Sequence, residues 1–433
     1  MDAPHADRGS ADTRALRAAL TARGVASSAQ LQAALGKSQP TVSRLLATLG
    51  PGLVLLGRGR RARYALPRSI LGAAGRQPLT WVRADGRIET WGQLSFVTGD
   101  QIHVEAPGIS LLSRGALPWF LAPLRGEGFL GRLLAQRLAA QGLDRDPARW
   151  SLEHVLFAAL QASDAPGALV LGEPRDVPPP GGNYDHLADD VATTLPTGSS
   201  AGGEQAKFLT RRADGAAVLV KFSPPRGTPF GERWHELLHA EALALEVLRD
   251  HGVAVAAARV IETPRRSYLE SLRFDRIGAT GRRHAVPLWA VHEAFVPGPK
   301  QHWAATCEAL ALQRRLPLEA VAQVRALRHF GRLIGNSDMH FGNLSLFVAQ
   351  DDLAPGRFTL APVYDMLPMR WRPDAATGAL DWLPFTPESI DLQSPARTVA
   401  AEFWRRAAVD AALSPGFRGL ARTMAARIAG AGS

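Results

Sequence analysis

Gly335-Asn336-Ser337-Asp338-Met339-His340-Phe341-Gly342-Asn343, followed later by Tyr364-Asp365, is the stretch of sequence that decides the fold. Residues 325–334 before it carry apolar side chains at helical spacing, and glycine commonly ends a helix. Two short apolar runs after the polar loop, residues 344–348 and 358–363, predict strands. The predicted order is therefore helix, polar loop, strand, turn, strand and a final aspartate.

The acidic and amide side chains of this stretch suit phosphoryl transfer from a magnesium-bound nucleotide. Asp338 is a candidate base, and Asn343 and Asp365 offer the oxygen atoms that Mg²⁺ prefers. Protein kinases carry their Asp-x-x-x-x-Asn and second aspartate on the same order of elements. Each of these residue types is also common in turns, where it bonds only to the backbone. Because all of them occur together, we predict a kinase site that uses ATP and Mg²⁺.

A segment of small residues lies upstream, over residues 197–208. Glycine and serine let backbone N–H groups approach phosphate oxygens, which bulkier side chains would prevent. The segment has neither the Walker A sequence nor Gly-x-Gly-x-x-Gly, so a flexible linker is the alternative. As a phosphate-binding loop, it would bind ATP through Ser199, Ser200, Ala201, Gly202, Gly203 and Gln205.

The run Ala217-Val218-Leu219-Val220-Lys221-Phe222 predicts a buried strand that carries a lysine. Protein kinases use a lysine on such a strand to bind the α- and β-phosphates. The helix predicted next, residues 232–250, places Glu241 on its apolar stripe. Burying a carboxylate without a partner is costly, so we predict a Lys221–Glu241 ion pair. The alternatives are an edge-strand lysine that faces water and a glutamate that reaches solvent.

Four ordered motifs resemble those of the HipA family of bacterial serine/threonine kinases. They are Ser-x-Ala-Gly-x-x-Gln-x-Lys at residues 199–207, Arg-Phe-Asp-Arg at 273–276, Asn-x-Asp-x-His-x-x-Asn at 336–343 and Tyr-Asp at 364–365. The match covers approximately residues 80–420, and the added N-terminal segment is most similar to the YjjJ branch of that family. The resemblance implies an α+β protein with a two-lobed, protein-kinase-like HipA fold.

The resemblance also implies roles for the residues of the polar loop. Asp338 would be the catalytic aspartate, Asn343 and Asp365 the magnesium ligands, and Lys221 the ligand of the ATP phosphates. His340 matches a family histidine near the phosphates, although a loop histidine that only packs is an equal alternative.

Two further roles follow from the resemblance alone. Residues 291–295 are similar to the hinge that contacts adenine, which would make Glu293 and Phe295 ATP-binding residues. Ser199 occupies a position like that of the serine whose autophosphorylation inhibits family members. Here the segment has two adjacent serines and one residue more than the usual form.

The N-terminal 70 residues predict a winged helix-turn-helix. Helices are expected over residues 12–23, 28–35 with Ser28 near the N-cap, and 38–49, where a proline lies in the first turn. The segment 53–66 then reads as strand, basic turn and strand. A third helix of this kind is the one that enters the major groove in helix-turn-helix proteins.

The charge distribution favours DNA as the ligand of this segment. Residues 1–76 carry 12 Lys or Arg against 3 Asp, whereas the whole chain has a net charge of only +10. A basic excess confined to one small domain is typical of a polyanion site, although a solvated turn or a protein-docking surface is the alternative for the arginines of the turn. The residues expected near bases or phosphates are Gln39, Thr41, Ser43, Arg44, Arg58, Arg60, Arg61 and Arg63.

Composition is consistent with an intracellular protein of several domains. The 433 residues are 46% hydrophobic, and we expect domains at residues 1–70, 77–298 and 299–433, with Pro297-Gly298-Pro299 between the kinase lobes. The single cysteine, Cys307, excludes an intramolecular disulfide. The sequence shows no signal-peptide-like or membrane-spanning hydrophobic segment, so we expect a cytoplasmic protein that is not bound to a membrane.

The primary hypothesis is an ATP- and Mg²⁺-dependent serine/threonine protein kinase, a HipA-like toxin, fused to a DNA-binding domain that regulates its own promoter. One alternative is a DNA-binding transcription regulator whose kinase-like part binds nucleotide without transferring phosphate. Another is a small-molecule phosphotransferase, because antibiotic kinases build their metal site from the same kinds of side chain. The expected partners are DNA through residues 1–70, an unidentified protein substrate, a separate antitoxin and a second copy of the chain.

Overall fold

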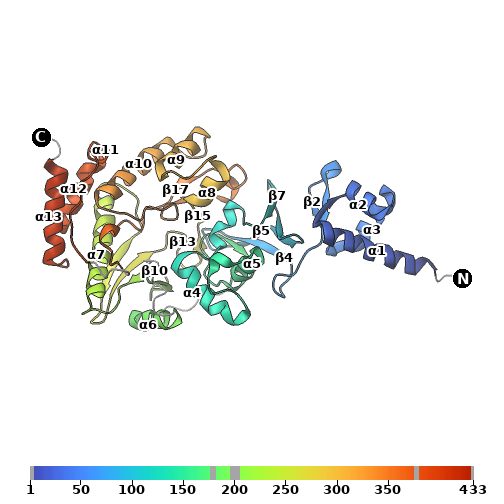
Figure 1. Cartoon of the computed structure of the whole chain (residues 1–433), viewed down its shortest axis with the longest axis horizontal. Coiled ribbons are helices and arrows are strands. Elements are labelled where there is room, and N and C mark those ends of the chain that lie inside the picture. Colours follow the sequence, from blue (N-terminus) through green and yellow to red (C-terminus); the bar gives the residue numbers. More distant parts are fainter. Residues whose placement is uncertain (1–3, 176–181, 196–204, 375–379, 431–433) are drawn as a thin grey trace.

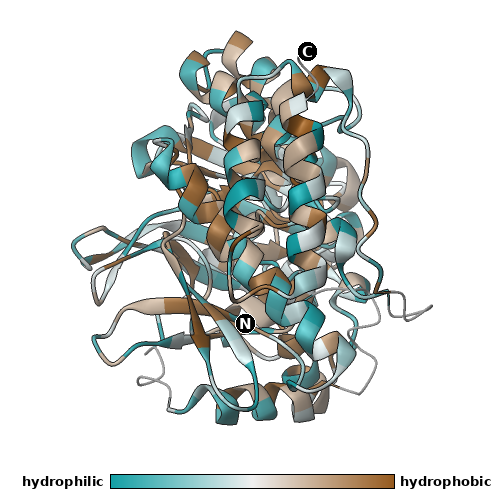
Figure 2. Ribbon diagram, turned by 90° about the vertical axis from the view of Figure 1, so that its left-hand side faces the viewer, coloured by the Kyte–Doolittle hydropathy of each residue, from teal (hydrophilic) through white to brown (hydrophobic). Residues whose placement is uncertain are grey.

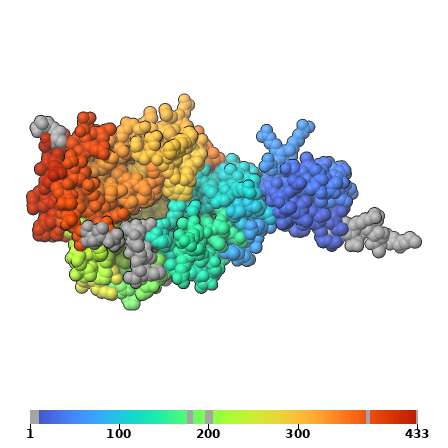
Figure 3. All heavy atoms as spheres, in the orientation of Figure 1, coloured from blue at the N-terminus to red at the C-terminus, as the bar shows by residue number. Residues whose placement is uncertain are grey.

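The computed structural model describes residues 4–175, 182–195, 205–374 and 380–430 of the chain. Helices and antiparallel sheets follow one another in four parts, from a small N-terminal domain at one end of the molecule to a helical C-terminal region at the other (Figure 1). Figure 3 shows the N-terminal domain projecting from the rest of the molecule. None of the helices in the described ranges is long and apolar enough to cross a membrane.

The N-terminal domain consists of three helices and a small antiparallel sheet in the order β1-β3-β2. Its elements are α1 (Pro4–Arg23), β1 (Val25–Ser27), α2 (Ser28–Leu35), α3 (Gln39–Leu49), β2 (Val54–Leu56) and β3 (Arg63–Ala65). The N-cap of α2 is Ser27 and not the predicted Ser28, because the Ser27 hydroxyl accepts the Gln30 N–H and the Gln30 side chain accepts the Ser27 N–H. Ser28 is therefore the first residue inside the helix.

Apolar residues spaced along the three helices form one core, which includes the fully buried Leu16, Leu20 and Leu31. A second, smaller cluster joins this domain to the next part of the chain: Val54, Leu56 and Ala65 pack against Val97. The hydroxyl of Thr98 also donates to the carbonyl of Gly24, at 3.1 Å. The N-terminal domain is thus packed against its neighbour rather than tethered by a linker alone.

The second part is a five-stranded antiparallel sheet in the order β7-β6-β5-β4-β8, with helices beside it. Its elements are β4 (Arg76–Val82), β5 (Ile88–Val97), β6 (Gln101–Ala106), β7 (Ile109–Arg114), α4 (Gly128–Leu138), α5 (Leu152–Gln161) and β8 (Leu169–Leu171). Trp81, Trp91 and Phe120 are buried between the sheet and its neighbours. This core extends into the C-terminal region, so the two parts form one packed body.

The third part is a four-stranded antiparallel sheet in the order β11-β12-β10-β9, packed against a long helix. Its elements are α6 (Tyr184–Thr194), β9 (Lys207–Arg211), β10 (Ala217–Phe222), α7 (Pro229–Asp250), β11 (Ala258–Glu262) and β12 (Ser267–Leu272). β10 is an inner strand of the sheet because it pairs with β12 on one side and with β9 on the other, and most of its residues are buried. Thr228 caps α7 by accepting the Gly231 N–H, and Pro229 occupies the first turn.

The C-terminal region is mostly helical. Its elements are β13 (Arg276–Ile277), β14 (Gly281–Arg282), β15 (Ala285–Pro287), α8 (Leu288–Phe295), α9 (Trp303–Leu312), α10 (Leu318–Leu333), β16 (Ser345–Phe347), β17 (Thr359–Leu360), α11 (Ser389–Leu392), α12 (Ala396–Ala407) and α13 (Pro415–Gly430). Figure 2 shows hydrophobic and hydrophilic residues alternating around these helices, as expected for helices that cover a core on one side.

The structure adds detail to the predicted segments in three places. The segment 77–298 holds the five-stranded sheet, the four-stranded sheet and the small sheet of β13 and β14, and the strands of each pair only within their own sheet in the described residues. The chain leaves the sheet of Lys221 after Leu272, well before the predicted passage at residues 297–299. The strand predicted over residues 358–363 pairs regularly only at Thr359 and Leu360, because the following residues bridge elsewhere.

Candidate active site

A lysine and two carboxylates meet where the third part of the chain contacts the C-terminal region. Lys221 lies in β10 and is buried, and its Nζ donates to both carboxylate oxygens of Glu241 on α7, at 2.6 Å each. The same Nζ also donates to Oδ1 of Asp365. The predicted Lys221–Glu241 pair is therefore present. Its burial removes the alternatives of a lysine and a glutamate that face water.

Asp365 has an unusual backbone and a strongly acidic side chain. Its φ is +57°, a left-handed conformation that non-glycine residues adopt rarely and mainly where the surrounding structure enforces it. Burial alone would raise the pKa of Asp365, but the Lys221 ammonium, with Lys207 and His340 nearby, outweighs burial and lowers the pKa to about 2. The side chain is therefore a carboxylate at neutral pH, which is the form that binds a metal ion.

The loop after α10 holds the other predicted site residues together. Gly335 ends the helix at φ +77°, and the buried Asn336 follows it. Asn336 Oδ1 accepts the Asp338 N–H at 3.0 Å, while its Nδ2 donates to the Asp365 carbonyl at 3.4 Å. Asn343 Nδ2 donates to the Asp338 carbonyl at 2.8 Å, so its Oδ1 is the atom left to act as a ligand. These bonds join the loop of Asp338 to the turn of Asp365.

A tyrosine fixes the far side of the same loop. The hydroxyl of Tyr364 donates to the Gly342 carbonyl at 2.7 Å and lies 2.8 Å from the Ser345 hydroxyl. Its ring packs against Phe274, just beyond the end of β12. Burial raises the pKa of Tyr364, so the hydroxyl stays protonated and acts as a donor.

His340 lies at the surface beside these residues. Its Nδ1 accepts the Gly342 N–H at 3.0 Å, and its backbone carbonyl accepts the indole N–H of Trp303 at 3.0 Å. The residue is exposed, and it is one of the groups that lower the pKa of Asp365. The structure thus places His340 close to the predicted metal ligands and open to solvent.

An open cavity of about 450 Å³ borders Asp338. Its walls include His302, Trp303, Arg328, Arg332, Met339 and His340. Of the two arginines in the wall, Arg332 pairs with Asp391 at 2.7 Å. For Arg328 the structure shows no hydrogen bond or ion pair in the described residues. The cavity gives a second molecule access to the Asp338 side of the site.

Two residues of the site were absent from the set predicted from the sequence. Lys207 lies directly opposite Lys221 in the antiparallel register of β9 and β10, and it acts electrostatically on both Asp365 and Glu241. Asn336 bridges the two loops. Both residues carried a signal, because Asn336 begins one quoted motif and Lys207 ends another, but only strand register places Lys207 beside Lys221.

The predicted adenine hinge is not supported by the structure. Residues 291–295 lie in helix α8, whose backbone groups bond within the helix and offer no extended edge to a base. Glu293 pairs with Lys300 at 2.5 Å, and Phe295 packs between Trp119 and Phe358. The segment that leaves the Lys221 sheet is instead the one after Leu272, so Phe274 lies where a hinge is expected.

The donor set fits a magnesium nucleotide. Asn343 Oδ1 and the Asp365 carboxylate are oxygen ligands of the kind Mg²⁺ takes, and Lys207 and Lys221 supply positive charge for phosphates. Gln205, just before β9, has a buried Nε2 with no hydrogen-bond partner in the described part of the chain. Such an orphan donor is expected where a ligand oxygen binds. The other residues predicted for the phosphate loop, Ser199, Ser200, Ala201, Gly202 and Gly203, lie outside the described residues.

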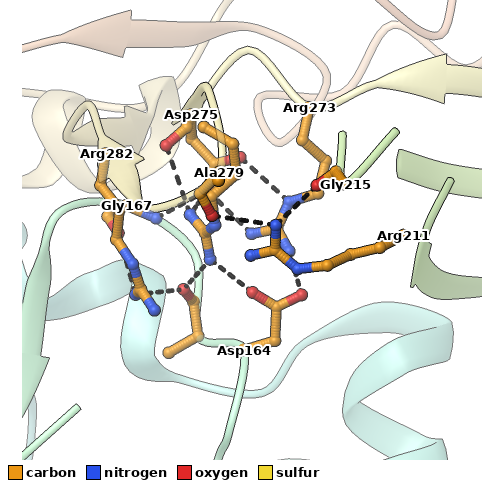
Figure 4. A network of polar contacts seen from close by, with 10 residues as sticks. Asp164, Gly167, Arg211, Gly215, Arg273, Asp275, Ala279 and Arg282 are labelled. Atoms are coloured by element: carbon orange, nitrogen blue, oxygen red, sulfur yellow. Dashed lines mark hydrogen bonds and ion pairs between the residues drawn. The ribbon is translucent and has the colours of Figure 1, made fainter. Parts of the chain in front are cut away.

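The Arg-Phe-Asp-Arg motif has a structural role. Arg273 and Arg276 donate to the two oxygens of Asp164, at 2.5 and 2.6 Å, and Asp275 accepts the Gly167 N–H at 2.9 Å (Figure 4). Burial would raise the pKa of Asp275, but Arg273 and Arg276 lower it well below its usual range. Because Asp164 and Gly167 belong to the second part of the chain, this network fastens that part to the start of the C-terminal region.

The residues predicted to contact DNA are mostly exposed. Arg58, Arg60 and Arg61 lie in the connection between β2 and β3, and Arg63 follows in β3. Near the start of α3, Gln39, Ser43 and Arg44 are exposed, while Thr41 is half-buried with its hydroxyl 3.1 Å from that of Ser38. The two groups belong to the same small domain.

The fold and the site together define a kinase-like protein. Comparison with known proteins gives the family: the HipA-like C-terminal domain matches residues 199–431, and the YjjJ-like toxin middle domain matches residues 73–175. Toxin YjjJ of Escherichia coli (strain K12) is 34% identical over 434 residues, which cover 94% of this chain and 96% of that protein. The chain belongs to the HipA-like family and to its YjjJ-like branch, which confirms the resemblance seen in the motifs.

A solved structure shows the same fold. It is a chain of the toxin–antitoxin complex of HipA, HipB and operator DNA from Shewanella oneidensis MR-1. The TM-score is 0.55 at 16% sequence identity, over 81% of this chain and 96% of that one. The likeness extends through most of the length of that chain.

Proposed function

We propose that this protein is an ATP- and Mg²⁺-dependent serine/threonine protein kinase, a HipA-like toxin. The observation that carries the proposal is the buried contact of Lys221 with both Glu241 and Asp365, next to a loop that holds Asp338 and Asn343. Protein kinases need this lysine–glutamate pair and this metal-binding aspartate in place together. No other group of described residues combines these features.

Each residue of the site has a role in this proposal. Bound MgATP supplies the phosphoryl group that is transferred. Asn343 Oδ1 and the Asp365 carboxylate hold the metal ion, and Lys221 and Lys207 neutralise phosphate charge. Asp338 orients the substrate hydroxyl and accepts its proton through its carboxylate. Asn336 keeps Asp338 and Asp365 in their relative positions, which is a positioning role.

The Lys221–Asp365 bond bears on how nucleotide binds. The ammonium group of Lys221 lies against the carboxylate that would hold the metal ion. Metal binding to Asp365 therefore competes with this bond, while phosphate oxygens offer Lys221 a replacement partner. We expect Mg²⁺ and ATP to bind much more tightly together than either does alone.

The experiment is incubation of the full chain with γ-labelled ATP and Mg²⁺, alone and with cell lysate. Wild type is expected to label itself or a lysate polypeptide, whereas Asp338→Asn and Asp365→Asn are not. Asp351→Asn, at an exposed aspartate outside the site, is the matched control and should behave as wild type. Equal labelling by wild type and Asp338→Asn would overturn the assignment of Asp338.

A binding measurement distinguishes the proposed kinase from a regulator that binds nucleotide without transferring phosphate. Calorimetric titration with a non-hydrolysable ATP analogue and Mg²⁺ should give one site per chain, weakened in Lys221→Met. Binding of this kind without any labelled product would favour the regulator. A labelled small molecule with no labelled protein would favour the small-molecule phosphotransferase.

We further propose that the N-terminal domain is a winged helix-turn-helix that binds DNA, with α3 in the major groove and the β2–β3 connection on the backbone. The exposed side chains of α3, the exposed arginines of the connection and the basic excess of residues 1–76 support it. The test is a mobility shift with duplex DNA from upstream of its own coding sequence. Binding should weaken steeply with salt, and Arg60→Ala plus Arg61→Ala should reduce the salt slope by about 2.

The matched control for that double variant is Arg145→Ala plus Arg149→Ala, at exposed arginines of the second part. DNA binding that changed neither with salt nor on replacement of Arg60 and Arg61 would contradict the DNA proposal, and it would leave the kinase proposal intact. A separate antitoxin partner, a homodimer, a cytoplasmic location and autophosphorylation at Ser199 remain proposals of the same kind. The HipA of the solved complex was captured with HipB and its operator DNA.

A further inference from the structure

A second group of ligand-type side chains lies on α7, apart from the kinase residues. His235 and His239 are one helical turn apart, so both rings face the same side, with centroids 4.5 Å apart. Glu262, the last residue of β11, faces the same place. The ligand atoms of the three side chains all lie within 4.8 Å of one another. No role proposed above uses any of them.

We propose that His235, His239 and Glu262 bind a divalent transition-metal ion of the zinc class. Two imidazoles and one carboxylate are a donor set that suits Zn²⁺, with bonds of about 2.0–2.2 Å. At tetrahedral angles such bonds separate neighbouring donor atoms by about 3.3 Å. His239 Nε2 and Glu262 Oε1 are now 2.9 Å apart, in a hydrogen bond. The two atoms need to separate only slightly for an ion to replace the proton between them.

The ring of His235 is already oriented as a ligand. Its Nε2 lies 3.2 Å from the Ala412 carbonyl, which can only accept, so Nε2 carries the proton and Nδ1 carries the lone pair. A backbone carbonyl on the far nitrogen is the usual support of a metal-bound histidine. Nδ1 now accepts from the Ser267 hydroxyl at 2.7 Å. Ser267 is the residue opposite Glu262 in the β11–β12 register, so this edge of the ring is turned toward Glu262.

The carboxylate is supported in the same way. Arg226 holds Glu262 Oε2 at 3.1 Å, which leaves Oε1 directed at His239. The Glu262 side chain is 45% exposed and that of His239 is 14% exposed, so water has access to complete the coordination. The ion would displace the Ser267–His235 bond and the His239–Glu262 bond, and the proton now on His239 Nε2 would move to Nδ1, which leaves a neutral imidazole as the ligand.

The spacing His235-Glu236-Leu237-Leu238-His239 is that of metalloprotease helices, in which the glutamate is the general base. Here Glu236 is buried, accepts the Ser414 N–H at 3.0 Å and lies 3.8 Å from Arg233. A carboxylate held in this way is not free to activate water, so we assign no hydrolytic reaction to the site. The ion would instead join α7 to β11, on the same helix that carries Glu241.

The test uses the full chain without a polyhistidine tag, stripped with chelator and titrated calorimetrically with ZnCl₂. We expect one site per chain in wild type, weakened by at least about 100-fold in both His239→Ala and Glu262→Ala. These two half-exposed residues are chosen because replacing the buried His235 risks misfolding. His186→Ala, at an exposed histidine of α6, is the matched control and should bind as wild type does.

Two further readouts do not depend on kinase activity. Co²⁺ in place of Zn²⁺ should give the visible absorption of a tetrahedral site in wild type and in His186→Ala only. Zn²⁺ should raise the melting temperature of these two proteins, but not that of His239→Ala or Glu262→Ala. The proposal would be overturned if wild type did not bind Zn²⁺, or if wild type and both ligand variants bound it equally strongly. Either result would count whether or not the protein is a kinase.

Discussion

The buried pair of Lys221 and Glu241 gives the sharpest prediction about stability. The perturbation is a double-mutant cycle of Lys221→Met and Glu241→Gln, in the absence of nucleotide. Lys221→Met leaves the carboxylates of Glu241 and Asp365 facing each other without the cation between them. Glu241→Gln leaves Lys221 its bond to Asp365. The lysine variant is therefore expected to be the more damaging of the two.

The magnitude follows from the geometry of the pair. At 2.6 Å, and with side chains 6% and 2% exposed, the attraction is about 6 kcal/mol for an effective dielectric constant of about 20. Desolvation offsets much of it, and removing one partner of a buried pair costs about 3–5 kcal/mol. We expect Glu241→Gln near the lower end of this range and Lys221→Met near the upper end. The double variant should cost at least about 2 kcal/mol less than the sum of the two.

The assay is urea denaturation, with amide hydrogen exchange of peptides from β10 and α7 to locate the loss. Lys300→Met is the matched control, because its pair with Glu293 is exposed and should change stability by less than about 1 kcal/mol. Additive effects, within about 0.5 kcal/mol, would refute the reasoning, because they would mean that the two side chains do not act on each other.

Three further predictions concern the rest of the fold. Asp164→Asn removes a partner of two buried arginines; it should destabilise the protein by about 3 kcal/mol or more and speed limited proteolysis between the second part and the rest. Burial lowers the pKa of His284 to about 4. The unfolded chain therefore binds more protons between about pH 6.5 and 4, and stability measured by urea titration should fall by up to about 3 kcal/mol as pH drops through this window, but less in His284→Gln. Gly335→Ala adds a Cβ 2.6 Å from the ring of Trp371 at φ +77°; it should lower the melting temperature and abolish label transfer.

Much of the site could be predicted from the sequence because its signals are local. The spacing from Asp338 to Asn343 lies within one loop, and an apolar strand with one lysine is visible without knowledge of its partners. The role of Glu241 could be predicted because helical periodicity placed this residue on a buried stripe, where a carboxylate requires a cation. In each case, a short window of sequence contains the physical reason for the residue.

The features that were missed depend on contacts between distant segments. A short segment such as residues 291–295 is compatible with a strand or a helix from its sequence alone, and the structure shows a helix whose Phe295 packs against Trp119 and Phe358. Lys207 ends a motif visible in the sequence, but its place opposite Lys221 depends on strand register, which the sequence does not display. The spacing of His235 and His239 is a local signal that the sequence analysis did not use, while the third ligand, Glu262, comes from another strand and depends on the fold.

The contacts of α7 limit how this protein can be regulated. In many kinases activity is controlled by moving the helix that carries the glutamate toward or away from the lysine. Here the same helix is fastened to the C-terminal region along its length: Arg233 donates to the Trp371 carbonyl at 2.6 Å, Ser414 N–H donates to Glu236, and Arg406 pairs with Asp250 at 2.8 Å. Moving α7 outward would break these buried and surface bonds together.

The contacts of α7 therefore favour a fixed Lys221–Glu241 pair. Under the proposed function, control would act on other elements, either on the access of nucleotide to Asp365 or on the access of substrate to the cavity beside Asp338. A metal ion at His239 and Glu262 would act in the same direction as the existing contacts, by holding α7 in place. Hydrogen exchange in α7 that stayed slow with and without ATP would agree with this view, and fast exchange around Glu241 in the free protein would contradict it.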